Sequence, residues 1–134
     1  MLKIIECLDK NLLLRFPIKP GIKIIPGNLV KITEYQGSFL IEISDGHSII
    51  GIATNKVLGA NEIRYSSIVR IFCQRAIIRT NKYDHKNKIN AGDCLYCSEI
   101  GEITSKIPFE GAVPIGKAVS LLEDKKSILE FLFL

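Results

Sequence analysis

The sequence predicts an all-β fold, a small β-barrel or β-clip-like domain of the β-tulip type with an internal pseudo-repeat. Short apolar runs dominate the 134 residues, and they are separated by glycine, proline and asparagine. Turn signals recur about every 6 to 12 residues, a spacing typical of barrels and sandwiches. Only residues 121–127 leave room for a helical turn.

The first half of the chain predicts a series of short strands. Residues 1–16 have no clean period, so they fit either short strands or an arm laid on a neighbour, and the prolines at 17 and 20 break the pattern. Beyond that break, the expected strands are 22–25, 29–35, 39–43 and 48–53, joined by turns at 26–28, 36–38 and 45–46.

The second half reads in the same way. A loop over 55–62 precedes strands within 63–72 and 74–80, and a charged surface loop covers 81–90. A tight turn, a strand, a glycine hairpin and a second strand follow over 91–104, and a third strand enters at 113–119. The final run, 127–134, has no polar alternation, so we expect a strand that is covered on both faces.

Similar segments recur at an offset of about 65 residues. Pro26-Gly27-Asn28-Leu29-Val30 parallels Ala91-Gly92-Asp93-Cys94-Leu95, and Ile50-Gly51-Ile52-Ala53 parallels Ile115-Gly116-Lys117-Ala118. Gly37 parallels Gly101, Gly46 parallels Gly111, and 68–72 parallels 128–132. Glycine is needed where φ is positive or where backbones pass closely, so matching glycines indicate a shared backbone path.

The repeat also bounds the domain organisation. Residues 1–25 are expected to form an N-terminal arm or edge strands, and 26–134 a single β-barrel domain, with half-repeats at about 5–70 and 71–134. Each half alone would be only marginally stable, so we expect the halves to share one core.

Charge and hydropathy exclude several classes of protein. The net charge is +4, but the basic residues are scattered among acidic ones, and no basic cluster has interleaved aromatics, so no specific nucleic-acid partner is expected. No apolar run is long enough to span a bilayer, so no membrane partner is expected. Acidic residues interrupt the N-terminal apolar stretch, which does not fit a signal peptide, so we expect residues 1–134 to be the mature chain.

The four cysteines, Cys7, Cys73, Cys94 and Cys97, are expected to be free thiols that pack as buried apolar groups. Cys94 and Cys97 have the CxxC spacing, and Cys7, Cys73, His47 or His85 could complete a zinc site. In a strand, however, residues three apart point to opposite faces, which disfavours a shared metal. We therefore expect no metal and no cofactor.

No catalytic residues are predicted. His47 and His85 fall in a turn and a charged loop, where solvated histidines are the simpler interpretation. The candidate carboxylates show no paired spacing; they are Glu34, Glu42, Asp84, Asp93, Glu99 and Glu102. Asp93 is expected to cap a turn with its side chain. We expect the protein not to be an enzyme.

One stretch resembles a known family. Gly-Asp-x-Leu-Tyr-x-x-x-x-Gly-x-Ile-Thr, followed after a spacer by Pro-Ile-Gly-x-Ala-Val, is similar to the C-terminal half of the head decoration (capsid cement) proteins of tailed bacteriophages. The matching residues are Gly92, Asp93, Leu95, Tyr96, Gly101, Ile103, Thr104, Pro114, Ile115, Gly116, Ala118 and Val119. The run 50–53 also fits the first strand of that family, and the resemblance covers about 26–134. The chain departs from the family at Lys117, where a small or apolar residue is common.

The resemblance implies a virion structural protein that binds the outer surface of the major capsid lattice and stabilises it. It implies the major capsid protein and further copies of the chain, as a homotrimer, as partners. The expected location is the surface of the phage head, after synthesis in the host cytoplasm. The alternatives are a tail or baseplate component, a nucleic-acid-binding barrel, and a small enzyme or ligand-binding β-clip domain.

Overall fold

The computed structural model describes residues 1–7, 13–60, 67–122 and 127–134, and within them every regular element is a strand. The predicted all-β class is confirmed. In chain order the strands are β1 (Leu2–Cys7), β2 (Leu13–Pro17), β3 (Lys23–Ile24), β4 (Leu29–Tyr35), β5 (Ser38–Ile43), β6 (Gly51–Ala53), β7 (Val57–Leu58), β8 (Ile68–Phe72), β9 (Ala76–Thr80), β10 (Cys94–Cys97), β11 (Ile103–Thr104), β12 (Gly116–Leu122) and β13 (Ile128–Phe133).

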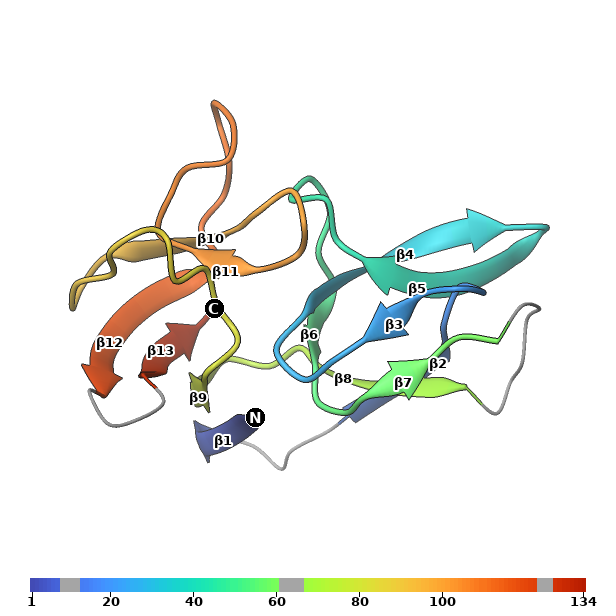
Figure 1. Ribbon diagram of the computed structural model, residues 1–134, viewed down its shortest axis with the longest axis horizontal. Helices are drawn as coiled ribbons and strands as arrows, with labels where there is room; N and C mark the ends of the chain where they lie inside the picture. The colour runs from blue at the N-terminus through green and yellow to red at the C-terminus, as the bar shows by residue number, and fades with distance from the viewer. Residues whose placement is uncertain (8–12, 61–66, 123–126) are drawn as a thin grey trace.

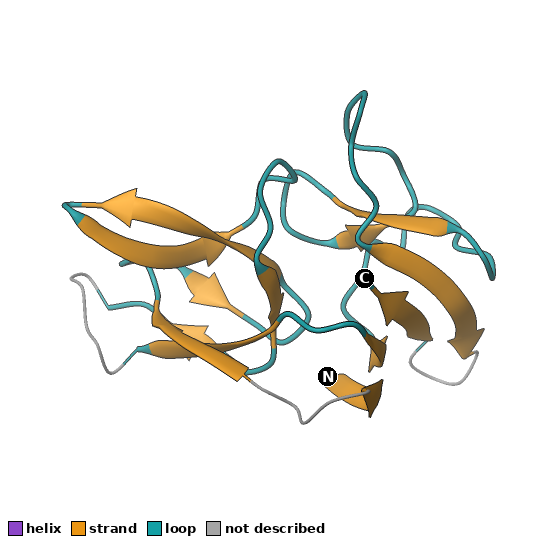
Figure 2. Ribbon diagram, turned by 180° about the vertical axis from the view of Figure 1, so that it is seen from behind, coloured by secondary structure: helices purple, strands orange, loops and turns teal. Residues whose placement is uncertain are grey.

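The strands form two lobes side by side along the long axis of the molecule (Figures 1 and 2). The first lobe contains a five-stranded sheet in the order β2-β8-β6-β4-β5 and the small pair β3-β7. The second lobe contains a six-stranded sheet in the order β1-β9-β13-β12-β10-β11. All pairs within these sheets are antiparallel, as turn-rich sequences with short connections allow.

The two lobes share one topology. Numbered along the chain, the strands of the first large sheet are β2, β4, β5, β6 and β8, and they lie in the order first, fifth, fourth, second, third. The strands β9 to β13 of the second lobe lie in the same order, and β1 is added at the outer edge of β9. This common order confirms the internal pseudo-repeat.

Individual hydrogen bonds repeat as well. In the first lobe they are Gly27 N to Ala53 O at 2.9 Å, Ala53 N to Asn28 O at 2.8 Å and Ile50 N to Val30 O at 2.9 Å. In the second they are Gly92 N to Ala118 O at 2.8 Å, Ala118 N to Asp93 O at 2.9 Å and Ile115 N to Leu95 O at 2.7 Å. The turn before each set is capped by a side chain, since Asn28 accepts from Ile25 N at 2.9 Å and Asp93 accepts from Asn90 N at 2.7 Å. The predicted capping role of Asp93 is therefore confirmed.

A further contact occurs in both lobes and brings together the two edges of the set of five strands. Lys19 N donates to Ile41 O of β5 at 2.9 Å, and an isolated parallel bridge links Ile18 with Ile41. In the second lobe, Asp84 N donates to Ile103 O of β11 at 2.8 Å. These contacts bring the segment after the first strand against the third, so each lobe curls into a barrel-like shape.

Gly51 and Gly116 occupy matching positions where two strands nearly touch. A Cβ on Gly51 would lie 2.5 Å from Phe72 O, and a Cβ on Gly116 would collide with Leu132 O. Because β6 and β12 approach β8 and β13 this closely, glycine is the only residue that fits.

Two hydrophobic clusters replace the single expected core. One lies within the first lobe and contains Ile18, Ile24, Val30, Ile41, Ala53, Val57, Val69 and Ile71. The other lies mainly in the second lobe, around Leu95, Ile103, Leu129 and Phe131, but it also takes in Leu29, Ile52 and Phe72 from the first. The sharing that the sequence predicted is therefore limited to one of the two clusters.

Several expectations about single elements need correction. Strand β6 begins at 51 rather than 48, and β7 lies inside the expected loop at 55–62. Strand β13 alternates, with Phe131 and Phe133 buried and Leu132 half-buried, so only one of its faces is fully covered. Most of the possible helical turn at 121–127 lies outside the described residues, and so does the start of the expected strand at 63–72.

The N-terminal segment supplies one strand to each lobe. Strand β1 is the outer edge of the second sheet, and β2 is the outer strand of the first. The division into an arm over 1–25 and one domain over 26–134 stays a prediction.

Candidate functional site

The lobes meet through glycines that leave no room between the backbones. A Cβ on Gly27 would lie 2.6 Å from Lys82 Cβ, and one on Gly46 would lie 3.0 Å from Cys97 O. From the other side, a Cβ on Gly101 would collide with the Ile43 side chain. All three glycines have positive φ, so they serve both the local turn and the contact between lobes.

Backbone and ring contacts complete this junction. Leu29 N, at the start of β4, donates to Gly101 O at 2.9 Å. The His47 ring stacks on Phe109 of the loop 105–115, with ring centroids 4.2 Å apart. The loops that carry these two rings occupy matching places in the two lobes, because each connects the third strand of its sheet to the fourth.

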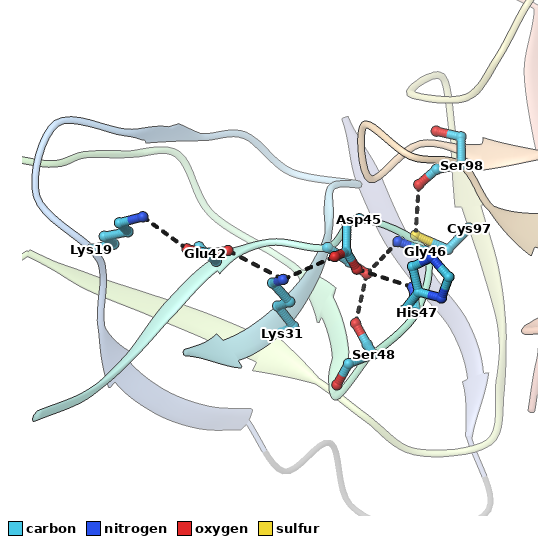
Figure 3. A network of polar contacts seen from close by, with 10 residues as sticks. Lys19, Lys31, Glu42, Asp45, Gly46, His47, Ser48, Cys97 and Ser98 are labelled. Carbon is cyan, nitrogen blue, oxygen red and sulfur yellow. Dashed lines mark hydrogen bonds and ion pairs between the residues drawn. The ribbon is translucent and has the colours of Figure 1, made fainter. Parts of the chain in front are cut away.

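A line of charges follows the first lobe toward the junction (Figure 3). Lys19 pairs with Glu42 at 3.2 Å, Glu42 with Lys31 at 3.3 Å, and Lys31 with Asp45 at 3.2 Å. The hydrogen bond with Asp45 is the main cause that raises the pKa of Lys31. The backbone N–H of His47, followed by Lys31, lowers the pKa of Asp45. This network orders the loop 44–48 beside Cys97 and Ser98.

A large hollow lies on the second lobe, between the loop 81–86 and the segments 98–108. Its volume is about 870 Å³, and its charged lining mixes Lys82, His85, Lys86 and Lys106 with Asp84, Glu99 and Glu102. Part of this charge is neutralised locally, because Lys82 lies 3.8 Å from Glu102. Lys86 and Lys106 are exposed and have no ion pair within the described part of the chain, although the charge of Lys86 also acts on the nearby Asp84.

Asp84 holds one wall of this groove in place. Its carboxylate accepts hydrogen bonds from Asn87 Nδ2 at 2.5 Å, Lys86 N at 2.9 Å and Thr104 Oγ1 at 2.9 Å. Burial by itself raises the pKa of Asp84, but these hydrogen bonds outweigh it, and the pKa lies below its ordinary value. Asp84 therefore works as a structural clamp between the loop and β11.

A second, smaller hollow lies where the loops 44–50 and 105–115 meet the C-terminus, and its lining mixes polar and apolar groups. Its volume is about 420 Å³, and Ile49, Phe109, Val113, Pro114, Phe133 and Leu134 contribute to its lining. Val113 is 79% exposed and Leu134 is 55% exposed. The exposed apolar groups mark a surface that can be covered by another protein.

The candidate residues from the sequence do not converge on one reactive centre. His47 and His85 are exposed and stack on Phe109 and Tyr83 respectively. Asp84, Glu99, Glu102 and His85 share the larger groove, while Glu42 belongs to the charge network and Glu34 lies exposed on β4. Among the described residues, no group of three or more His, Cys, Asp and Glu side chains is placed to hold a metal ion.

The cysteines correct an expectation. All four are free, but only Cys97 is buried, whereas Cys73 is exposed and the other two are partly buried. Burial raises the pKa of the Cys97 thiol, so this group is a weak nucleophile.

Sequence reasoning missed both hollows. Each is lined by loops that lie far apart in the chain, and only the lysine-rich run at 82–88 gave a local signal for the larger one. Within the described residues, no helix has the length and apolar character needed to cross a membrane.

Comparison with solved structures finds a protein of similar fold. No protein-family model matches the sequence, and no curated protein matches it. The structure is similar to the crystal structure of the head fiber gp8.5 N base of bacteriophage phi29, with a TM-score of 0.62 and 13% sequence identity. The match covers 92% of this chain and 95% of that one.

The chain is similar in fold to a phage head fibre base. The match extends over both lobes of this chain. At 13% identity the likeness establishes the fold alone.

Proposed function

We propose that this chain is a structural protein of a phage head that binds the outer surface of the major capsid lattice and stabilises it. The observation that carries the proposal is the fold similarity to a phage head fibre base over 92% of the chain. The decoration-protein resemblance in 91–119 points to the same coarse class, a structural protein of the phage head. Membership of the decoration family itself stays a prediction.

The site chemistry supports a binding role. An attachment protein needs no reactive side chain, but it needs a rigid fold and exposed groups that a shell can contact. The backbones at the junction pass closely, and the exposed apolar side chains on the loops include Ile100, Ile107 and Val113. A tail or baseplate location is the alternative within this class, and the head fibre likeness favours the head.

For the shell contact we propose the larger groove on the second lobe. Lys86 and Lys106 offer positive charge and form no ion pair among the described residues, and Ile100 adds an apolar side chain that is 66% exposed. Such a surface suits an acidic segment of the major capsid protein, because charge complementarity gives register and specificity. Attachment as a homotrimer, at junctions between capsomers, is part of the same proposal.

The test uses expanded shells assembled from the major capsid protein without this chain. Purified protein is mixed with the shells, and binding is measured by co-sedimentation together with the temperature at which the shells break open. We expect saturable binding, a higher opening temperature, and binding about tenfold weaker for Lys86→Glu combined with Lys106→Glu.

A matched control keeps the change of charge and moves it to the first lobe. Lys23→Glu with Lys56→Glu alters exposed lysines on β3 and beside β7, so it should leave shell binding unchanged. If the wild-type chain neither sediments with the shells nor alters their opening temperature, the proposed function is wrong.

A further inference from the structure

The junction between the lobes joins two different surfaces. The first lobe contributes a junction face, which consists of Gly27, Leu29, Gly46, Ile52 and Phe72. The second lobe contributes a junction end, which consists of Thr80, Lys82, Cys97, Ser98 and Gly101. The two lobes have the same fold. The second lobe therefore has a counterpart of the junction face, and the first lobe has a counterpart of the junction end.

The glycines show that these counterparts are vacant. Gly27, Gly46 and Gly101 touch the opposite lobe, whereas a Cβ on their counterparts Gly92, Gly111 and Gly37 would meet nothing within 4 Å. Positive φ is kept at all six positions. A left-handed backbone therefore recurs at each pair, and only one member of each pair lies against the opposite lobe.

The vacant face lies on the second lobe. Its members are counterparts of the junction face, namely Gly92, Cys94, Lys117 and Leu132. Gly111 is not one of them, because its loop lines the smaller hollow at the junction. Cys94 and Leu132 are partly buried, and Lys117 is exposed, while Leu29, Phe72 and Ile52 at the matching places are completely buried.

The vacant end lies on the first lobe, at the tip of the β4-β5 hairpin. Its members are Ile32 and Gly37, the counterparts of Cys97 and Gly101, together with Glu34 and Phe39, which extend the hairpin and have no counterpart in the junction end. Ile32 is 43% and Phe39 70% exposed. This hairpin reaches one extreme of the long axis, and β10 and β12 of the vacant face lie toward the other (Figure 1). One molecule cannot bring the two surfaces together.

Charge also matches between the vacant surfaces. The vacant end carries Glu34, and the vacant face carries Lys117. Neither side chain has an ion pair within the described residues. The counterpart of Lys117 in the first lobe is Ile52, which is buried at the junction. A lysine at this position is stable only if its charge faces solvent or an acidic group.

We infer that copies of this chain associate head to tail, with the vacant end of one copy on the vacant face of the next, in the way that the two lobes pair within the chain. A head-to-tail contact forms a closed ring when its rotation closes and a filament when it does not. The inference names the surface of self-association and needs no shell. It can therefore be tested independently of the proposed function.

The experiment is sedimentation of the purified chain over a range of concentrations, with the wild type and three variants. Glu34→Lys and Lys117→Glu each place like charges together, so each should weaken association about tenfold. The double variant restores opposite charges and should return association close to the wild-type level. Lys23→Glu, an equal change on an exposed strand lysine outside both surfaces, should have no effect.

A wild-type chain that stays monomeric at every concentration would overturn the inference. So would an oligomer that the single reversals leave intact, or one that the double variant does not restore. A monomer that still decorates shells would leave the proposed function standing, and an oligomer that ignores shells would leave this inference standing.

Discussion

At the scale of single residues, the glycines of this chain have two separable roles. Gly37 and Gly101 both follow the second strand of a lobe with φ of 78° and 75°, values that side chains rarely adopt. Of the two, only Gly101 also lies against another lobe, where an added Cβ would collide with Ile43 and lie 3.0 Å from Leu29 O. The pair therefore separates the cost of backbone strain from the cost of a blocked contact.

Gly37→Ala should lower the free energy of unfolding by about 1 kcal/mol, the cost of a side chain in this backbone conformation. Gly101→Ala should cost about 3 kcal/mol, because the added methyl group also forces the lobes apart. Chemical denaturation in dilute solution measures both. If both variants lost the same free energy of unfolding, the junction would be able to accommodate the added methyl group and would not be closely packed.

Asp84 predicts an acid-sensitive contribution to stability. Its pKa is depressed in the folded chain, so its contribution is present above the unfolded pKa, about 4, and is lost as the pH falls through the lower folded pKa. At pH 7, Asp84→Asn should cost about 1 kcal/mol, because an amide cannot accept from Asn87, Lys86 and Thr104 together.

Denaturation of wild type and Asp84→Asn across pH 2 to about 7 tests this, since other carboxylates affect both proteins alike. The gap in stability between the two should narrow below about pH 4. A gap that stays constant on acidification would show that the carboxylate charge is not what holds the loop.

At the scale of elements, β1 shows how an edge strand is recruited from far away in sequence. It pairs with β9 from Leu2 with Thr80 to Cys7 with Ala76, and the register shifts between Ile4 and Glu6. Leu2, Ile4 and Cys7 pack against the cluster of the second lobe. A bulge in an edge strand disfavours further pairing with other chains.

Removal of residues 1–7 should lower stability by about 2 to 4 kcal/mol, because it uncovers the cluster and leaves β9 as a bare edge. Thermal unfolding and light scattering measure the loss and the expected aggregation. Lys3→Ala, which keeps the strand and changes one exposed side chain, should shift stability by less than about 0.5 kcal/mol. Unchanged stability after the deletion would mean that β1 contributes nothing to the second lobe.

At the scale of the whole molecule, local patterns predicted the strands and the repeat. The alternation of apolar and polar residues correctly predicted the strand 29–35. The glycines at an offset of about 65 residues predicted that the two lobes have a common backbone path. The sequence did not predict β7, because Val57 and Leu58 become a strand only by pairing with Lys23 and Ile24. Nor could it place Leu29, Ile52 and Phe72, whose burial is decided by the opposite lobe. The two hollows escaped prediction for the same reason.

The crossed placement of β1 and β2 has a consequence for synthesis on the ribosome. Strand β2 can pair with β8 once residues 68–72 have emerged, whereas β1, made earlier, must wait for β9 at 76–80. Until then the first seven residues are a tethered, apolar strand without a partner. The nascent chain can thus complete the five-stranded sheet first, and β1 docks only when the second lobe takes shape.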